Sequence, residues 1–331
     1  MELQNSPMDS PRMDTQQGFP NAIEASRPSL LISDILAQGR PVFSVEFFPP
    51  KDESGHHRFI ETAQSLKDHF YPDFVSITYG AGGSTREPTL RYARHLKEAY
   101  GFEVMPHLTC VGHSQDELIA IVKAFKASGF RNLMVLRGDP PKGTSDFQPH
   151  PQGLHYASEF VALMRDQFPE FCLGVAGYPE THPEAVDAKT DLRHLLHKVN
   201  LGANFITTQL FYENGHYFDF VARCRSAGIT IPILPGLLPV RSLEQVQRFC
   251  KLCGATLPSA LEQALIKAGG VEEAVRKVGV EWAYKQAQEL LKKGAPGVHL
   301  YCLNDSKSAL DLIQRLRPEP IIDAAVSKKH T

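Results

Sequence analysis

Glu46 is a carboxylate inside an otherwise apolar stretch, VFSVEFFPPK, which covers residues 42–51. An ionised carboxylate costs free energy to bury without a partner. Burial in an apolar wall also disfavours the charged form, which suits a general acid that must keep its proton near neutral pH. The sequence offers two explanations for Glu46: proton donation, or an ion pair with Arg137 or Lys51.

Asp139 is the second acidic candidate, because it follows another apolar run, RNLMVLRG, at residues 131–138. If the two runs are strands of one barrel, Glu46 and Asp139 both reach its mouth. Two carboxyl groups there could share acid and base roles. We therefore take both as catalytic candidates.

Polar side chains also close the other apolar runs. A single threonine or tyrosine is normal in a strand, and a lone histidine is more often structural than catalytic. Their recurrence at the same end of successive runs is harder to explain by structure alone. We expect one functional site built from these ends, with candidates Thr78, Tyr79, His107, Thr109, Arg137, Asp139, Tyr178, Glu180, His182, Thr207, Thr208, Gln209, Tyr301 and Asn304.

Eight strand-like runs must position these residues: PVFSVEFF, DFVSITYG, EVMPHLTC, RNLMVLRG, FCLGVAGY, NFITTQLF, IPILPGLL and GVHLYCL. Helical stretches separate most of them, and one carries a capping box (Ser114 with Glu117). Strands separated by helices pair in parallel, and eight such units favour a closed α/β fold, the (β/α)8 TIM barrel. In this fold the functional groups lie at the carboxyl ends of the strands. Three further helical stretches predict extra helices inserted between strands seven and eight.

The chain divides into one folded domain and two short ends. Residues 1–28 are too poor in apolar side chains to offset chain entropy, so we expect a disordered leader. Residues 29–318 form the predicted catalytic domain, and 319–331 a flexible tail. Two loops stand out: GAGGSTR (80–86) lacks the third glycine and the lysine of nucleotide fingerprints, and YPETHPEA (178–185) predicts a polar loop over the mouth.

Composition excludes several function classes. The formal net charge of −2 shows no basic excess of the kind that nucleic acid selects. No apolar run approaches the roughly 20 residues of a membrane-spanning helix, so we expect no membrane partner. The six scattered cysteines predict reduced thiols and a cytoplasmic location. CKLC at 250–253 lacks a second pair, so it predicts two thiols on one helix and no metal.

Taken together, the motifs resemble the methylenetetrahydrofolate reductase family from about Ser29 to Pro318. VEFFPPK, FVSITYGAGGSTR, PHLTC, LRGDPP, GYPETHPEA, KVNLGANFITTQLFY, ILPGLLPV and LYCLN occur in the family order. The resemblance implies a flavin-bearing (β/α)8 barrel. It also implies an oxidoreductase of one-carbon metabolism and methionine biosynthesis, and we expect a homo-oligomer.

The chemistry that the resemblance implies is a two-step hydride relay. NADH or NADPH passes hydride to FAD and leaves, and methylenetetrahydrofolate then enters and becomes methyltetrahydrofolate. Glu46 would be the general acid that helps open the folate's five-membered ring, and Asp139 would affect both flavin and folate. The implied cofactor contacts are Thr78, Tyr79, His107, Arg137, Gly138, Asp139, Ala157, Tyr178, His182, Ala185, Asp191 and Lys198, and the implied substrate contacts are Gln209, Gln245, Phe249 and Tyr301.

Two departures from the family pattern matter. Bacterial relatives carry an arginine that helps to hold folate where this chain reads Asp305, in YCLND, so we expect altered folate handling. The chain also ends soon after the barrel. The resemblance therefore predicts that the S-adenosylmethionine-binding regulatory domain is absent.

Two other functions remain open from the residues. A barrel hydrolase could use Glu46 and Asp139 as acid and base, although its sugar platforms are usually aromatic and the single tryptophan, Trp282, lies in the predicted insertion. A non-catalytic folate- or flavin-binding module would keep the pocket without turnover. The joint presence of Glu46, Asp139 and Gln209 weighs against that module.

Overall fold

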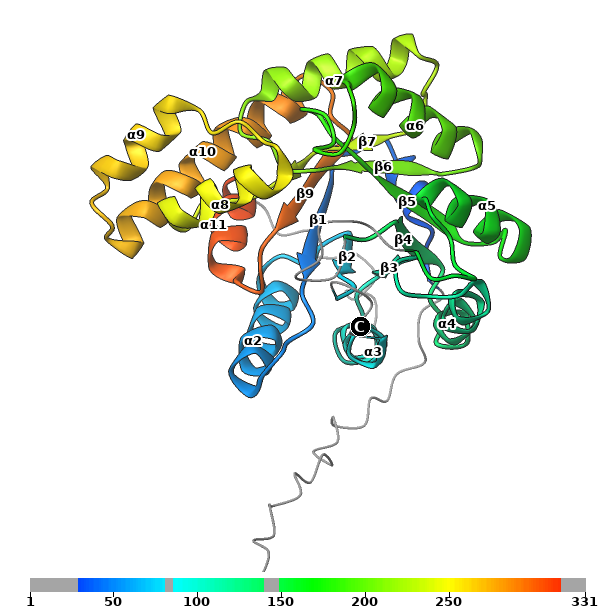
Figure 1. Cartoon of the computed structure of the whole chain (residues 1–331). Coiled ribbons are helices and arrows are strands. Elements are labelled where there is room, and N and C mark those ends of the chain that lie inside the picture. The colour runs from blue at the N-terminus through cyan, green and yellow to red at the C-terminus, as the bar shows by residue number, and fades with distance from the viewer. Residues whose placement is uncertain (1–28, 81–85, 140–148, 317–331) are drawn as a thin grey trace, which may run out of the picture.

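The computed structural model describes residues 29–80, 86–139 and 149–316, and shows helices around a parallel sheet (Figure 1). The predicted leader and tail, and most of the GAGGSTR loop, lie outside the described residues. The strands are β1 (Val42–Phe47), β2 (Phe74–Ile77), β3 (Val104–Thr109), β4 (Asn132–Leu136), β5 (Cys172–Gly177), β6 (Phe205–Thr208), β7 (Ile233–Leu234), β8 (Gly236–Leu237) and β9 (Gly297–Tyr301). The helices are α1 (Ile32–Leu36), α2 (Glu53–His69), α3 (Arg86–Tyr100), α4 (Gln115–Ala127), α5 (Ala157–Gln167), α6 (Ala188–Asn200), α7 (Asn214–Ser226), α8 (Leu243–Cys253), α9 (Ser259–Lys267), α10 (Glu272–Lys292) and α11 (Ser306–Leu316).

The strands run in the order β7-β6-β5-β4-β3-β2-β1-β9-β8, and each neighbouring pair is parallel. β7 pairs with β6, and β8 pairs with β9. Only Pro235 separates these two short strands, and proline has no N–H to give to a ladder. β7 and β8 therefore serve together as the seventh strand of an eight-stranded barrel. The (β/α)8 fold predicted from the sequence is confirmed.

The predicted insertion is also confirmed, as α8, α9 and α10 follow β8 and precede β9. Figure 1 shows α8, α9 and α10 grouped on one side of the barrel. The sequence signals for the start and end of α4 are confirmed in detail. Ser114 and Glu117 make the reciprocal capping-box bonds at the start of α4, and Gly129 adopts a left-handed φ of 76° just after its end.

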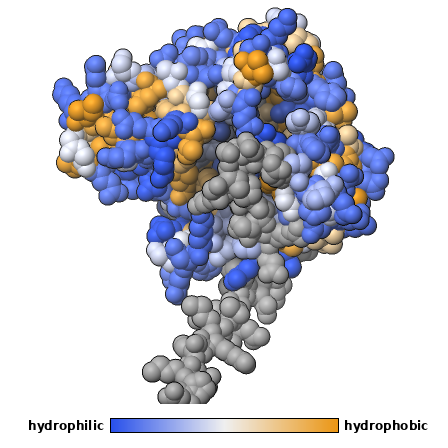
Figure 2. All heavy atoms as spheres, viewed as in Figure 1, coloured by the Kyte–Doolittle hydropathy of each residue, from blue (hydrophilic) through white to orange (hydrophobic). Residues whose placement is uncertain are grey.

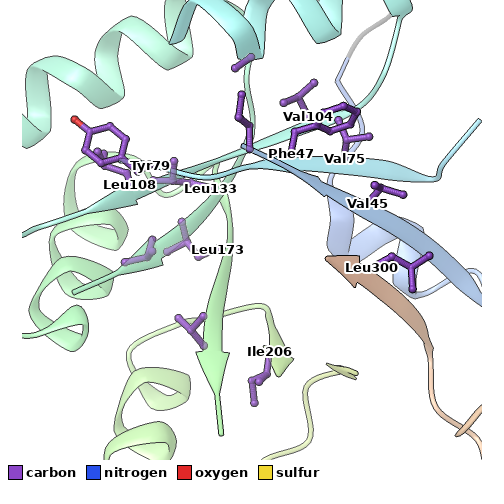
Figure 3. Close-up of a cluster of buried hydrophobic side chains, with 14 of the residues drawn as sticks. Val45, Phe47, Val75, Tyr79, Val104, Leu108, Leu133, Leu173, Ile206 and Leu300 are labelled. Atoms are coloured by element: carbon purple, nitrogen blue, oxygen red, sulfur yellow. The ribbon is translucent and has the colours of Figure 1, made fainter. Parts of the chain in front are cut away.

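Alternate residues of each strand point to opposite faces, which gives the barrel two cores. The outward residues, such as Val45, Phe47 and Leu133, pack beneath the helices (Figure 3). The inward residues near the amino ends form an apolar floor that includes Val42 and Phe74. Helix α1 closes this floor from below with Ile32, Ile35 and Leu36.

The surface is mostly hydrophilic in the view of Figure 2, with hydrophobic patches over the inserted helices. Leu252, Ile266 and Val271 are exposed there. Within the described ranges, no helix combines the length and apolar character that crossing a membrane requires.

Candidate active site

Glu46 lies near the carboxyl end of β1, on the inward face of the barrel, and is only 6% exposed. Its Oε2 atom lies 3.5 Å from Nε2 of His107 and 3.5 Å from Nε2 of His299. The Ser76 hydroxyl donates to the same oxygen at 3.4 Å. Strands β3, β9 and β2 thus each send one polar side chain to one carboxyl oxygen.

Both histidines lie in the barrel interior. Burial lowers the pKa of His107 to about 4, although the charge of Glu46 acts in the opposite direction. His107 is therefore neutral near pH 7. His299 is fully buried, and its Nδ1 atom lies 2.8 Å from the Ser44 hydroxyl. Among the described residues, neither Nε2 atom has a hydrogen-bond partner of good geometry. Both are thus available to the carboxyl group.

The apolar stretch around Glu46 suggested that its neighbours form an apolar wall around the carboxyl group, and the structure corrects this. Val45 and Phe47 belong to the outward core, because successive strand residues alternate between faces. The group that faces Glu46 is polar. The alternative ion pair with Arg137 or Lys51 is not formed either, since the ion pairs of Glu46 within the described residues go to the two histidines.

Asn304 clamps the chain just beyond Glu46. Its side chain accepts from the Phe48 N–H at 2.9 Å and donates to the Phe48 carbonyl at 2.7 Å. Leu303 and Asn304 both adopt left-handed backbone conformations, with φ of 53° and 55°. Non-glycine residues hold such conformations only where the surroundings impose them. The end of β9 therefore fixes the end of β1.

Tyr301 links β9 to β6 across the broken seventh strand. Its hydroxyl donates to the Thr208 carbonyl at 2.6 Å. A Cβ atom at Gly236 would lie 2.7 Å from that hydroxyl, so glycine makes room for the tyrosine. Burial, followed by the charge of Glu46, raises the pKa of Tyr301, which keeps its hydroxyl protonated.

Arg137 begins a row of basic groups on the other side of the mouth. Its guanidinium makes a two-pronged pair with Glu184 at 2.6 and 2.8 Å, and this bond raises its pKa. Gly138 has a φ of 91°, and a Cβ there would lie 2.5 Å from a methyl group of Val111. Only glycine lets the chain pass this close to the end of β3.

His182 and Lys198 extend the row. The His182 ring lies 4.5 Å from the ring of Tyr178, and its backbone N–H donates to Asp191 at 3.0 Å. Lys198 donates to the carbonyl of Ala176 on β5 at 2.9 Å. Burial lowers the pKa of Lys198 to about 8, partly opposed by the charge of Asp191. Helix α6 thereby directs an ammonium group toward the sheet.

The remaining predicted residues lie around these groups with varied roles. Asp139 is exposed after β4, and its charge contributes to the raised pKa of both Arg137 and Tyr178. The Tyr79 hydroxyl lies 3.0 Å from His113, and the Thr78 N–H donates to the Phe47 carbonyl. The half-buried members of the predicted set, for which the structure shows only local or packing contacts, are Ala157, Ala185, Gln209, Gln245 and Phe249.

The residues present fit a flavin dinucleotide. Arg137 and Lys198 supply the cations that a pyrophosphate needs. The hydroxyls of Thr109 and Thr207, on the inward faces of β3 and β6, are buried without a hydrogen-bond partner among the described residues. Buried polar atoms of this kind are rare in folded proteins unless a ligand or water meets them. FAD would bind along the ends of β3 to β6 and α6.

Three residues of the polar cluster around Glu46 escaped the sequence analysis: Ser44, Ser76 and His299. A signal existed for Ser44, because it stands two residues before Glu46 and so shares its face. The same spacing existed for His299, which stands two residues before the candidate Tyr301, but it gave no link to Glu46. It faces Glu46 only because β9 pairs with β1, with Ser44 opposite His299.

The CKLC thiols lie as the sequence suggested. Cys250 and Cys253 both belong to α8, and all six cysteines are free. Burial, then Cys250 and Asp139, raises the pKa of Cys253 to about 11, so this thiol is protonated near pH 7. In the described residues no cluster of three or more metal-binding side chains is present.

Known proteins match this chain over most of its length. The family model described as methylenetetrahydrofolate reductase matches residues 31–317. The chain is 35% identical to 5,10-methylenetetrahydrofolate reductase of Escherichia coli, over 89% of this chain and 97% of that protein. It is 36% identical to a probable methylenetetrahydrofolate reductase (NADH) of Oryza sativa, over 86% of this chain and 50% of that protein. The chain thus spans about half the length of the plant relative.

A solved structure supports the fold. An uncharacterized protein from Clostridium thermocellum that binds two copies of 5-methyl-5,6,7,8-tetrahydrofolic acid superposes with a TM-score of 0.58 at 18% identity. The superposition covers 87% of this chain and 99% of that one. At this identity the likeness concerns the barrel alone. The family model and the bacterial relative carry the assignment, and by them the chain belongs to the methylenetetrahydrofolate reductase family.

Proposed function

We propose that this chain reduces 5,10-methylenetetrahydrofolate to 5-methyltetrahydrofolate, with FAD as its cofactor and NADH or NADPH as electron donor. The observation that carries the proposal is Glu46, a buried carboxyl group at the barrel mouth whose Oε2 alone meets the surrounding polar groups. The family assignment supplies the substrate class.

The residues divide the work by position. When bound, the flavin supplies the hydride chemistry. Arg137 and Lys198 hold its phosphates, and Asp139 adds a negative charge at the same end of the barrel. Glu46 gives a proton to the folate nitrogen as the folate ring opens, which is a general-acid step. Tyr301 is the register partner of Glu46 on β9, and its protonated hydroxyl adds no second negative charge there.

Anaerobic absorption spectroscopy of the purified protein tests the proposal. We expect a visible flavin band that bleaches with NADH or NADPH and returns when methylenetetrahydrofolate is added. A colourless protein that takes up no added FAD would contradict the cofactor assignment. A flavin that is reduced but never reoxidised by the folate would contradict the substrate assignment.

The setting of the reaction belongs to the same proposal. We propose that the enzyme acts in the cytoplasm, because its six thiols are free, and that it works as a homo-oligomer. Its product would serve methionine biosynthesis within one-carbon metabolism. Analytical ultracentrifugation of the flavin-loaded protein measures the assembly, and a monomer at micromolar concentration would contradict that part.

A further inference from the structure

His299 is a fully buried side chain, and neither sequence motif nor family resemblance pointed to it. Its ring is fixed on three sides. The Ser44 hydroxyl lies 2.8 Å from Nδ1, Phe74 stacks on the ring at 6.3 Å with an interplanar angle of 15°, and Tyr301 meets it edge-on at 5.2 Å. With the ring held by these contacts, Nε2 lies 3.5 Å from Oε2 of Glu46.

The two oxygens of Glu46 have different surroundings. Ser76, His107 and His299 all meet Oε2, and no described residue forms a hydrogen bond or ion pair with Oε1. A carboxyl group held by one oxygen presents the other to whatever enters the mouth. The proton that leaves the protein would therefore leave from Oε1.

The chemistry of the imidazole sets the direction of its bonds. A Glu46 that carries its proton on Oε1 leaves Oε2 as an acceptor, so His299 needs a hydrogen on Nε2 to bond that oxygen. Nδ1 is then an acceptor, and the Ser44 hydroxyl donates to it. By donating to Nδ1, Ser44 thus favours the tautomer of His299 that carries its hydrogen on Nε2, where it can bond Glu46.

We propose that His299, held by Ser44, is a positioning residue that fixes Oε2 of Glu46 and so presents Oε1 as the proton-donating oxygen. The proposal rests on the proposed function for its catalytic consequence. Its geometric content stands on the three contacts of the ring and the shared oxygen. His107 meets the same oxygen, but within the described part of the chain no hydrogen bond fixes its ring, so His299 is the member that sets the position.

A matched pair of variants tests the proposal. His299→Gln places an amide nitrogen near the position of Nε2, where it can still donate to Glu46. His299→Asn places one near Nδ1, where it reaches Ser44 only. We expect His299→Asn to slow folate-dependent flavin reoxidation about 10²-fold and His299→Gln to stay within about threefold of the parent, because small misplacements of a reacting group carry penalties of that size.

Nicotinamide-dependent flavin reduction is the internal control, since it needs no proton from Glu46. We expect this step, the flavin content and the melting temperature to be alike in the two variants. Equal losses in both variants, or parallel losses in both half-reactions, would show that His299 is only a packing residue. If His299→Asn does not fold, Ser44→Ala provides the second test, and it should slow reoxidation without slowing flavin reduction.

A measurement without turnover separates this inference from the proposed function. Nitrogen NMR of the histidine rings, with His299 assigned by its loss in His299→Gln, should report hydrogen on Nε2 in the parent protein. The His299 signals should shift in Glu46→Gln and in Ser44→Ala. If the parent shows no folate-dependent reoxidation, the proposed function fails while these shifts still support the geometry. Unshifted signals in both variants would overturn the positioning role itself.

Discussion

At the scale of a single residue, Glu46 is buried among polar side chains, and in the proposed reaction it would serve only one of the two half-reactions. Glu46→Gln keeps the shape of the side chain but cannot give up a proton as a carboxylic acid does. The folate step should fall by about 10²–10⁴-fold, the usual loss for a general acid. Flavin reduction by the nicotinamide should persist. Stopped-flow absorbance measures each step. Equal slowing of both would mean that Glu46 is structural, and no slowing would place the acid elsewhere.

We expect Lys198 to make cofactor binding sensitive to pH. Burial lowers its pKa from 10.5 to about 8, so between these values the unfolded chain binds more protons than the folded one. The stability of the cofactor-free protein therefore gains a contribution as pH rises through this window. Phosphate binding needs the charged ammonium, so the affinity for FAD should fall above about pH 8.

Lys198→Ala should weaken FAD binding about 10–100-fold, because a charged hydrogen bond contributes roughly 1–3 kcal/mol. It should also flatten the fall in affinity above pH 8. Lys189→Ala, at an exposed position in the first turn of the same helix, is the matched control. Fluorescence titration of the apoprotein with FAD at several pH values measures the affinity and its pH dependence for each variant. Identical curves for the two variants would remove Lys198 from the cofactor site.

At the scale of elements, the end of α6 connects packing to the proposed cofactor site. The Ala203 N–H donates to the carbonyl of Lys198 at 3.3 Å, and Ala203 is 5% exposed. Ala203→Val adds two methyl groups in this tight place, which typically costs about 1–3 kcal/mol. We expect faster flavin loss on dilution, with normal turnover when FAD is saturating.

Ala227→Val is the control for Ala203→Val, because Ala227 lies directly after the end of α7 and its N–H donates to carbonyls of that helix, those of Arg223 and Cys224. Flavin fluorescence after dilution reports the release rate. If both variants release flavin alike, the effect is general destabilisation. If Ala203→Val retains flavin as the parent does, the end of α6 does not support Lys198.

The strands and helices could be predicted from this sequence more completely than the site could. Apolar runs of β-branched residues between helical stretches led to the barrel and to the insertion, because both signals are local. The partners of Glu46 come from β2, β3 and β9, far along the chain. Only the register of paired strands brings them together, and a one-residue shift would turn each side chain to the other face. The apolar wall predicted around Glu46 was wrong for this reason.

At the scale of the whole molecule, α1 closes the floor of the barrel. Ile32, Ile35 and Leu36 are buried there, and the Ile32 N–H donates to the Asn132 side chain at 2.9 Å. The first contacts described in the chain are those of Ser29 and Leu30 with Glu103. Truncation before Ser29 and truncation after α1 should therefore differ sharply.

Deleting residues 2–28 should leave the melting temperature and turnover nearly unchanged. Deleting residues 2–37 removes α1, and each fully buried isoleucine or leucine contributes about 1.5–3 kcal/mol. Urea unfolding should therefore show a free energy of unfolding that is lower by several kcal/mol for the longer deletion only. A large loss from the shorter deletion would mean that the leader packs on the barrel.

The interruption at Pro235 has a consequence for motion. β7 and β8 each join the barrel through only two paired residues, so the barrel wall is more weakly hydrogen-bonded there than between the other strands. We call this weakly bonded part of the wall the seam. Local openings begin where the fewest backbone bonds must break. Hydrogen exchange should therefore exchange the backbone amide hydrogens of Leu234 and Leu237 well before that of Val45.

The seam lies between β6 and β9, where the Tyr301 side chain passes Gly236 to reach the Thr208 carbonyl. Breathing of the barrel would therefore widen the mouth beside Glu46 itself, and the same weak seam that admits solvent would admit the substrate.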